Sequence, residues 1–566
     1  MPRTNGIFIL STFLFIVQLP AADPDPVFAE HGLVVSANRL ASEIGVKILE
    51  QGGNAVDAAV ATGFALAVTH SQAGNIGGGG FMVAHLADGR TFTLDYREQA
   101  PAAAGRDMFL DSTGKVIEKL SISTHLASGV PGSVDGLLTA WADYGSGNIS
   151  RKQLLAPAVA LARRGYPISR RYADHLNSQK DFFTGDPGTA AIFIRADGRP
   201  WQAGDLLVQQ DLARTLQLIV KNGRDGFYTG PVADLIVAEM QRGGGLITHA
   251  DLKNYQSHYR EPLTGTFREY GILTMPPTSS GGVLVIQMLN MLENFEIDSI
   301  GWNSSAYIHL LTEVERRAYA DRAEHLGDPD FWDIPLDMLI SKDYARRRSA
   351  SITSSEATPS GEVGAGQTWP AESPETTHYS VIDRAGNAVS VTTTLNFSFG
   401  SGITVDGAGF LLNNEMDDFS SKPGVPNAFG LLGNEANAIA PGKRMLSSMT
   451  PTIVLKNDQP YLLVGAPGGS TIITTVLQII LNVIVHKMDI QEAVAAPRIH
   501  SQWYPDVISA EIRSLSTDVV ANLELLGHKV ETHRWGYIGR ANCILVDSTG
   551  IYGGADPRGE NAAVGY

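Results

Sequence analysis

The first part of the chain has apolar residues at helical spacing. Residues 40–51 carry one such alanine-rich pattern, which ends at the glycine pair 52–53. Asn54, followed three residues later by Asp57, is typical of a helix N-cap and predicts a second helix that runs to Thr69. We therefore expect two packed helices near the start of the fold.

Later segments change to the pattern of β-strands. Residues 378–383 and the β-branched run 388–395 are typical of strands and flank the turn sequence 384–387. They predict a hairpin that begins beside Thr376.

Glycines interrupt the pattern at two further places. A second predicted hairpin, 452–455 with 461–464, leads through the glycine-rich segment 465–470 into a long apolar helix. Another glycine run, 77–80, precedes the strand-like segment 81–85, and no lysine follows it as a phosphate-binding loop requires. We interpret this run as a tight backbone turn.

The middle of the chain is organised differently from both ends. From about residue 145 to 343, helical patterns alternate with glycine and proline, which predicts a largely helical elaboration. Ser, Thr, Glu, Gly and Pro then dominate residues 349–375. The only large apolar residues of this segment are Ile352, Val363 and Trp369, so we expect an exposed, mobile linker.

Composition excludes several classes of protein. The chain of 566 residues is 43% hydrophobic and 18% charged, which is typical of a folded globular protein rather than a disordered one. Lys and Arg number 43 against 59 for Asp and Glu, and the resulting net charge of −16 repels polyanions. We therefore expect no nucleic-acid partner.

Cysteine and histidine give no sign of a metal site. Cys543 is the single cysteine, so the chain forms no intrachain disulfide and no paired-cysteine metal site. The 14 histidines are dispersed, without the spacing of zinc-binding motifs. We expect no metal and no cofactor.

The N-terminus has the pattern of an export signal. Arg3 precedes a largely apolar run, 7–19, and small residues follow it. The run is shorter than the roughly 20 residues that span a bilayer, and no later segment is long and apolar enough to do so. We expect a signal peptide, 1–22, with cleavage as late as residue 29, and a periplasmic or secreted protein.

Thr376 lies at the junction of the predicted linker and the first hairpin. A threonine in this position is usually an ordinary strand residue or cap. If the bond between Glu375 and Thr376 were cut, Thr376 would carry a hydroxyl nucleophile and a free α-amine with a pKa of about 7.7 to 8.0. One residue would then supply both a nucleophile and a base.

Several separate motifs follow one another along the chain: Gly74-Asn75-Ile76-Gly77-Gly78-Gly79-Gly80-Phe81, Thr376-Thr377-His378-Tyr379-Ser380, Ser447-Ser448 and Pro467-Gly468-Gly469-Ser470. In this order, and with the linker before Thr376, they resemble the γ-glutamyltranspeptidase family. The resemblance runs from about Gly32 to the C-terminus, and several motifs in one order are far more specific than a lone glycine-rich loop.

The resemblance implies a fold and a maturation step. The implied fold is α+β, a four-layer αββα sandwich of the N-terminal nucleophile hydrolase type with a helical elaboration. The implied step is self-cleavage between Glu375 and Thr376. It gives a heterodimer of a large subunit, 30–375, and a small catalytic subunit, 376–566.

The resemblance also implies catalytic roles around Thr376. Thr394 would hydrogen-bond the amine or hydroxyl of Thr376 and support processing. The peptide N–H groups of Gly468 and Gly469 would form the oxyanion hole. From the residues alone, we would favour an ordinary strand threonine at Thr394, and the two glycines could form a plain helix-entry turn.

A γ-glutamyl donor carries an α-carboxylate and an α-ammonium, and both need partners in a sheltered site. By resemblance, the α-carboxylate is bound by Arg97 with Ser447 and Ser448, and the α-ammonium by Asn396, Glu415 and Asp418. Two alternatives remain open from the residues alone. Arg97 could pair with Glu98 on the surface, and Asp417 with Asp418 could form a solvated turn.

The function implied is transfer of the γ-glutamyl group of glutathione or a related donor to amino acids, dipeptides or water. A glutaryl-type cephalosporin acylase of the same family is one alternative. Glu415 and Asp418 argue against it, because a glutaryl group has no ammonium to neutralise them. An unprocessed, catalytically silent binding homologue is the other alternative.

Residues 421–445 resemble the lid loop that covers the site in many members. Phe429 stands where well-known bacterial members have a tyrosine, whose hydroxyl bonds the residue that corresponds to Asn396. Phenylalanine has no hydroxyl to donate. We therefore hypothesise a looser lid and more hydrolysis relative to transfer.

Overall fold

The structure is a computed structural model that describes residues 25–364, 376–428, 430–533 and 536–566. Several predicted features lie outside the described residues: the signal peptide 1–22, the end of the linker at 365–375 with Glu375, and Phe429. No helix in the described ranges has both the length and the apolar character needed to cross a membrane.

Two antiparallel sheets, each with seven strands in the described part of the chain, form the centre of the fold. The first has the strand order β1 (Val27–Ala29), β18 (Gly550–Ala555), β17 (Asn542–Asp547), β13 (Gln459–Val464), β12 (Thr452–Lys456), β9 (Tyr270–Thr274) and β8 (Leu263–Phe267). The second has the order β19 (Ala562–Gly565), β2 (Leu33–Ser36), β10 (Thr377–Ile382), β11 (Ala388–Thr394), β3 (Gly79–His85), β4 (Thr91–Asp95) and β7 (His258–Arg260). Both sheets therefore contain strands from before and after Thr376.

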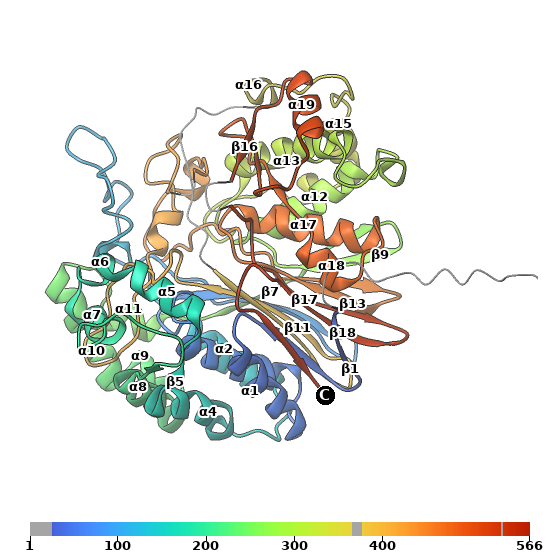
Figure 1. The fold of residues 1–566 in the computed structure, drawn as a ribbon. Helices are drawn as coiled ribbons and strands as arrows, with labels where there is room; N and C mark the ends of the chain where they lie inside the picture. Colours follow the sequence, from blue (N-terminus) through green and yellow to red (C-terminus); the bar gives the residue numbers. More distant parts are fainter. Residues whose placement is uncertain (1–24, 365–375, 429, 534–535) are drawn as a thin grey trace, which may run out of the picture.

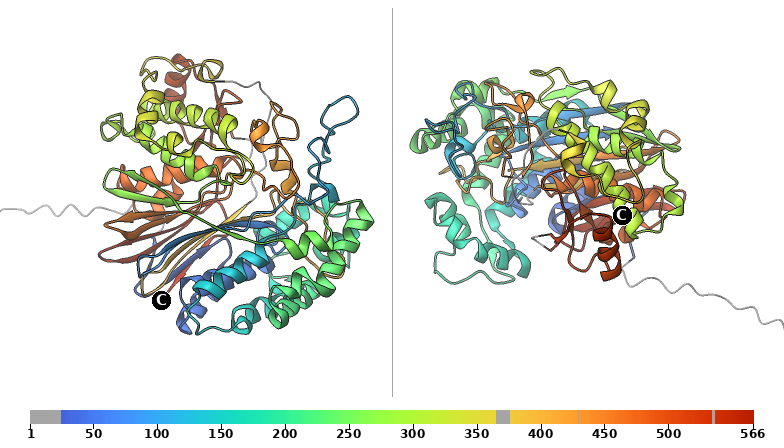
Figure 2. Two further views of the ribbon diagram at one scale, coloured as in Figure 1. Left: turned by 180° about the vertical axis from the view of Figure 1, so that it is seen from behind. Right: turned by 90° about the horizontal axis from the view of Figure 1, so that it is seen from above.

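The sheets stack face to face, and helices cover the outer face of each (Figures 1 and 2). The helices that form these outer layers are α1 (Arg39–Glu50) and α2 (Ala55–Thr69) against the second sheet, and α12 (Gly281–Leu292) and α17 (Thr471–Ile484) against the first. Helix α13 (Ser305–His325) packs on α12. This four-layer αββα sandwich confirms the predicted α+β fold class.

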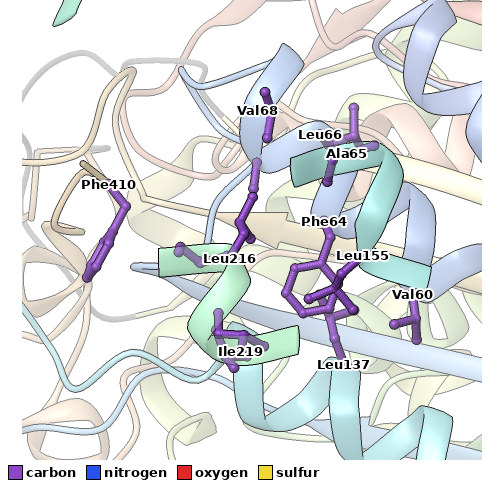
Figure 3. Packing of buried hydrophobic residues seen from close by; sticks show 14 of the residues in the cluster. Val60, Phe64, Ala65, Leu66, Val68, Leu137, Leu155, Leu216, Ile219 and Phe410 are labelled. Carbon is purple, nitrogen blue, oxygen red and sulfur yellow. The ribbon is translucent and has the colours of Figure 1, made fainter. Parts of the chain in front are cut away.

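The two predicted N-terminal helices are present, and their caps explain where they begin. The side chain of Asn54 accepts a hydrogen bond from the Asp57 N–H, and the Asp57 side chain accepts one from the Asn54 N–H. Every residue of α2 is buried. It packs against α3 (Ser133–Tyr144), α4 (Arg151–Arg164) and the neighbouring α8 (Gln210–Asn222), with Phe64 beside Leu137 and Leu155 in Figure 3. Burial on all sides stabilises this helix mainly through its apolar contacts.

Both predicted hairpins are confirmed. Strands β10 and β11 pair with Thr377 opposite Thr393, and β12 pairs with β13 with Thr452 opposite Val464. The glycine-rich segment after β13 leads directly into the predicted apolar helix, α17, whose residues are all buried.

The middle of the chain is largely helical, as predicted. Beside α4 and α8 it contains α5 (Arg170–Ser178), α6 (Lys180–Phe183), α7 (Pro187–Phe193), α9 (Asp225–Tyr228), α10 (Gly230–Gly243), α11 (His249–Asn254) and α14 (Leu336–Leu339). It also contributes β7, β8 and β9 to the two sheets, together with a small pair, β5 (Tyr166–Pro167) and β6 (Leu206–Leu207). Strand β8 is a short edge strand with three residues at least partly exposed, so it carries little of the apolar pattern that identifies strands.

The first part of the predicted linker is anchored to the body of the protein. It begins at the end of α15 (Lys342–Ser349) and includes α16 (Ser360–Val363). The Ala357 N–H donates to the Leu526 carbonyl at 2.7 Å, and the Ser360 hydroxyl to the Trp503 carbonyl at 2.6 Å. This part packs near α19 (Thr517–Leu525) and the small sheet of β14 (Ile499–His500), β15 (Ile508–Ala510) and β16 (Val530–Thr532). Helix α18 (Ile490–Ala495) instead packs on α17 and β18. Most residues of 350–364 are exposed, as their composition suggests, whereas Ala357 and Ser360 are buried anchor points.

Candidate active site

Thr376 and Thr394 meet at the end of the central hairpin. The register of β10 and β11 places Thr376, just before β10, beside Thr394, the last residue of β11. Their hydroxyl oxygens are 3.4 Å apart, and Thr376 is only 6% exposed. The Thr394 hydroxyl also accepts a hydrogen bond from the Asn396 N–H at 2.8 Å. The predicted contact between the two threonines is present.

The glycine run begins in a bend before β3 and continues into that strand, so the predicted tight turn holds for Gly77 and Gly78, whereas Gly79 and Gly80 are strand residues. The Asn75 side-chain amide donates to the Thr394 carbonyl at 2.8 Å, which ties the turn to the end of β11. A Cβ atom on Gly78 would lie 2.1 Å from that same carbonyl oxygen, so only glycine fits there. The motif therefore supports the backbone behind Thr394.

Gly468 and Gly469 lie in the loop between β13 and α17. Their φ angles of +139° and +57° fall in the region that favours glycine. Gly469 lines the same pocket as Thr376, and Gly468 precedes it in the loop without lining the pocket. The loop is held from behind, because the Tyr319 hydroxyl donates to the Ser470 carbonyl at 2.5 Å. Both N–H groups thus belong to a fixed turn beside the candidate nucleophile.

Arg97 is at the centre of a buried cluster of charges. It is 1% exposed, and its Nη1 lies 2.7 Å from the Glu415 carboxylate, while its Nη2 pairs with Asp418. Glu98 is also buried, with a carboxylate oxygen 3.4 Å from Nη1. The alternative of a surface pair between Arg97 and Glu98 is therefore wrong.

The acidic segment is not a solvated turn either. It forms a short 3-10 helix, η3 (Glu415–Asp418), in which Glu415 and Asp417 are buried and the Asp418 side chain is 14% exposed. The Ser121 hydroxyl donates to Asp417 at 2.6 Å. This segment presents its carboxylates to the protein interior.

Burial dominates the ionisation of this cluster. It raises the pKa of Glu415 well above its usual value, despite the opposing effect of Arg97, and it raises the pKa of Asp418 as well. It raises the pKa of Glu98 to about 8. Burial alone would lower the pKa of Arg97, but the surrounding carboxylates outweigh it and raise that pKa. Three carboxylates thus surround one guanidinium.

Some carboxylate oxygens in this cluster have capacity for another donor. Oε2 of Glu415 and Oε1 of Glu98 are buried without a hydrogen-bond partner among the described residues. A buried acceptor without a donor is costly, and a cationic ligand group removes that cost. The cluster therefore fits a ligand with an ammonium group.

The remaining predicted residues lie in the same pocket. Asn396 has a φ of +74°, which asparagine tolerates better than most residues, and its amide donates to the Asn414 carbonyl at 3.1 Å. It also hydrogen-bonds Asp418, which favours the charged form of that carboxyl. Ser447 and Ser448 line the opposite part of the pocket wall with Leu446 and Met449.

Arg322 is a pocket residue that sequence reasoning missed. It projects from α13, with its Nε donating to the Ser280 hydroxyl at 3.0 Å and its Nη2 lying 3.5 Å from the Ser448 hydroxyl. The pocket therefore has two guanidinium groups. No local signal identified Arg322, because it belongs to a run of charged residues on a long helix.

The described parts of the predicted lid, 421–428 and 430–445, form a loop beside this region. It has little regular structure apart from the short helix η4 (Glu435–Asn437), and Leu431 lines the pocket. The Asn437 amide donates to the Asp418 carbonyl at 2.7 Å, so the loop is tied directly to η3.

Among the described residues, one buried group has the residue types of a metal site: His309, Glu313 and His528. Nδ1 of His309 and Nε2 of His528 share a hydrogen bond of 2.7 Å, and Glu313 pairs with Arg316 and Arg317. These ligand atoms are thus already used within the protein. The group gives no reason to revise the expectation of no metal.

Comparison with known proteins agrees with this geometry. The family model described as Gamma-glutamyltranspeptidase matches residues 41–566. A glutathione hydrolase proenzyme from Escherichia coli K12 is 47% identical over 544 residues, which cover 96% of this chain and 93% of that protein.

Two solved structures are also similar to this chain. A cephalosporin acylase from Bacillus halodurans has a TM-score of 0.84 at 26% identity and covers 98% of this chain and 99% of its own. A γ-glutamyltranspeptidase from Helicobacter pylori has a TM-score of 0.58 at 45% identity and covers 62% of this chain and 99% of its own. The chain, with its N-terminal nucleophile hydrolase fold, belongs to the γ-glutamyltranspeptidase family.

Proposed function

We propose that this protein is a γ-glutamyltransferase and glutathione hydrolase with Thr376 as its nucleophile. One observation carries the proposal: the pocket that contains the Thr376 hydroxyl also contains buried side chains of both charges. An amino-acid end with a carboxylate and an ammonium needs such a pair of partners. Glutathione offers that end on a γ-linked amide.

The active form is a two-subunit enzyme made from one precursor. The similar E. coli protein is named a proenzyme, which supports processing here. We place the cut between Glu375 and Thr376, giving subunits 30–375 and 376–566. The N-terminal pattern at 1–22 supports export to the periplasm or outside the cell.

Cleavage frees the α-amine that the reaction needs. The Thr376 hydroxyl attacks the γ-carbonyl carbon, and its proton passes to this amine. The N–H groups of Gly468 and Gly469 stabilise the oxyanion that forms, and Thr394 holds the hydroxyl in position. The leaving amine takes the proton, which leaves a γ-glutamyl ester on Thr376. An amino acid, a dipeptide or water then attacks that ester.

The donor's α-carboxylate and α-ammonium replace ion pairs that are already present in the pocket. Arg97 pairs with Glu415 and Asp418 in the structure. The donor's carboxylate pairs with Arg97, assisted by Ser447 and Ser448, and its ammonium pairs with the two carboxylates and Asn396. Each buried charge keeps a partner through this exchange, which avoids a cost of several kcal/mol for an unpaired ion.

The acylase alternative has support in the similar B. halodurans structure. A direct comparison of γ-glutamyl-p-nitroanilide with glutaryl-p-nitroanilide separates the two functions, because the glutaryl donor has no ammonium. We expect a preference for the γ-glutamyl donor of about 100-fold or more. Faster release of p-nitroaniline from the glutaryl donor would establish the acylase, and release from neither would favour the silent homologue.

The same pair of donors tests the pocket residues. Glu415→Gln removes one partner of the ammonium, so the preference falls by about tenfold. Glu293→Gln is the matched control, since Glu293 pairs with Lys342 outside the pocket. An unchanged preference in Glu415→Gln would exclude Glu415 from recognition of the donor.

The lid remains a further part of the proposal. We expect the loop 421–445 to exclude water from the ester, and Phe429 to make this closure looser than a tyrosine would. Phe429→Tyr is expected to shift the product ratio from hydrolysis toward transfer. An unchanged ratio of glutamate to γ-glutamyl product would refute this role.

A further inference from the structure

Arg322 and two serine-containing segments form a polar wall at the donor pocket. Arg322 projects from α13 and is 5% exposed. Ser447 and Ser448 line the pocket, whereas Ser280, at the start of α12, is fully buried and does not line it. The two lining serines already have a proposed role in binding the donor's α-carboxylate. The contacts of Ser280 and Arg322 with these serines determine where their hydroxyl groups point.

Ser280 fixes the backbone of Ser447. Its peptide N–H and its hydroxyl both donate to the Ser447 carbonyl, at 2.8 Å and 2.7 Å. The Ser447 N–H in turn donates to the Thr278 carbonyl at 3.0 Å. Nε of Arg322 donates to the Ser280 hydroxyl oxygen at 3.0 Å. Because a guanidinium accepts no hydrogen bond, this contact directs the Ser280 hydroxyl proton away from Arg322 and toward Ser447.

The hydroxyl groups of Ser447 and Ser448 also face protein donors. The Ser447 hydroxyl oxygen accepts from the Met449 N–H at 3.1 Å, and the Ser448 hydroxyl oxygen lies 3.5 Å from Nη2 of Arg322. Within the described ranges, neither hydroxyl proton has an acceptor. Both protons therefore remain for an acceptor in the pocket, and a carboxylate accommodates two donors at once.

Arg322 also adds positive charge to the pocket. Burial raises the pKa of Asp418, and Arg97 and Arg322 oppose that shift. The two guanidinium groups have different partners. Arg97 pairs with carboxylates, which a charged donor can replace, whereas Nε of Arg322 bonds a neutral hydroxyl that holds the pocket wall. Arg322 can therefore support a bound anion without giving up its contact with Ser280.

We propose that Arg322 is a positioning residue for the donor's α-carboxylate, and that it acts through Ser280 on the segment Ser447–Ser448. Arg97 supplies the direct ion pair, and Arg322 keeps the two hydroxyl donors aimed at the same anion. The inference rests on the proposed function and deepens it. If Arg322 only stabilised α13, its loss would affect all donors equally. A positioning role instead affects the donors that carry the carboxylate.

Three anilide donors separate these two roles in the mature enzyme. γ-Glutamyl-p-nitroanilide carries both charged groups, γ-aminobutyryl-p-nitroanilide lacks the carboxylate, and glutaryl-p-nitroanilide lacks the ammonium. In Arg322→Gln, we expect the preference in kcat/KM for the γ-glutamyl over the γ-aminobutyryl donor to fall about tenfold, mainly through KM. The preference over the glutaryl donor should change by less than about twofold, because both donors carry the carboxylate. Where a donor reacts too slowly, competitive inhibition by glutamate, γ-aminobutyrate and glutarate gives the same comparison.

Two further variants test the path through the serines. Ser280→Ala removes the hydroxyl that links Arg322 to Ser447 but removes no charge. It should lower the preference over the γ-aminobutyryl donor by about threefold, and it serves if Arg322→Gln does not fold. Arg322→Lys keeps the charge but loses the planar fork, so it should restore only part of this preference.

Each removal has a matched control outside the pocket. Ser42→Ala is the control for Ser280→Ala, because Ser42 is also fully buried and its hydroxyl donates to the Ala562 carbonyl at 2.9 Å. Arg348→Gln is the control for Arg322→Gln, because Arg348 pairs with Asp321 on the same helix, α13. Neither control should change the preference for any donor.

The outcomes separate this inference from the proposed function. If the unmodified enzyme cleaves none of the three donors, the proposed function fails and the inference fails with it. If it cleaves the γ-glutamyl donor, but Arg322→Gln slows all donors equally or none, the inference alone is overturned. A changed preference in Arg322→Gln without any change in Ser280→Ala would also overturn it, because Arg322 would then act without the serines.

Discussion

The two cavities that have Thr376 in their walls differ in how deeply their charged side chains are buried. In the pocket of Arg97, a guanidinium that is 1% exposed is surrounded by the carboxylates of Glu98, Glu415 and Asp418. The second cavity beside Thr376 is lined by Glu560 and by three arginines, of which Arg171 is exposed and Arg540 and Arg558 are half-buried.

This difference indicates two kinds of recognition. Buried charges cannot be satisfied by water, so the Arg97 pocket accepts a ligand only if it supplies both an anion and a cation. Charges at a hydrated rim lose less when a partner is missing. We therefore expect strict selection of the γ-glutamyl group in the Arg97 pocket and a weaker dependence on any single charge in the second cavity.

The largest expected effect comes from breaking the buried side of the comparison. Arg97→Gln removes the guanidinium that pairs with Glu415 and Asp418, which is also the proposed partner of the donor's α-carboxylate. We expect kcat/KM for γ-glutamyl-p-nitroanilide to fall by about 1,000-fold and the free energy of unfolding by about 3 kcal/mol. Steady-state kinetics and denaturant unfolding measure the two effects.

The control for this variant is Arg106→Gln. Arg106 pairs with Glu435 of the lid loop, and both side chains are exposed. An exposed pair contributes at most about 1 kcal/mol, so the loss of stability should be small. Equal losses in Arg97→Gln and Arg106→Gln would show that burial does not distinguish the two pairs.

An intermediate effect on the pH dependence of stability is expected from Glu98, one of the three carboxylates around Arg97. Burial raises the pKa of Glu98 to about 8, from an ordinary value of 4.5. Between these values the folded protein retains a proton that the unfolded chain has released, so its stability falls as the pH rises. Glu98→Gln removes this contribution, and the slope of unfolding free energy against pH should become less negative by up to about 1.4 kcal/mol per pH unit. Parallel curves for the two proteins would contradict this assignment.

The smallest expected effect is that of salt. Raising NaCl from about 0.05 M to about 0.5 M screens exposed charges far more than buried ones. The small loss of stability in Arg106→Gln should therefore decrease at high salt, while the loss in Arg97→Gln changes little, because Arg106 pairs with Glu435 at the surface and Arg97 pairs with Glu415 in the interior. An equal dependence on salt in both variants would contradict the distinction between buried and exposed charges.

Much of the fold could be predicted because its signals are local. The Asn54 and Asp57 cap and the paired strands 377–382 and 388–394 depend on neighbouring residues. Strands β8 and β9 were missed because they are short and Gly265 interrupts the first, and because β9 joins the sheet through β12, which is distant in sequence. The middle was therefore predicted as largely helical, without these strands.

The site was predictable only as far as its motifs reach. Thr376, Thr394 and Arg97 belong to recognisable segments, and the structure brings them together. The burial and the charged neighbours of these residues could not be predicted from the motifs. Whether Arg97 faces solvent or three carboxylates depends on how η3 packs against β4, and Arg322 reaches the pocket from a helix with no motif.

The central claim is that Thr376 becomes the N-terminal nucleophile of the small subunit. N-terminal sequencing of the purified chains, before and after Thr376→Ala, tests it most directly. We predict a fragment that begins at Thr376 in the unmodified protein and a single uncut chain without γ-glutamyl transfer in the variant. A folded, uncut chain from the unmodified sequence, or a Thr376→Ala protein that is still cut and active, would contradict the account.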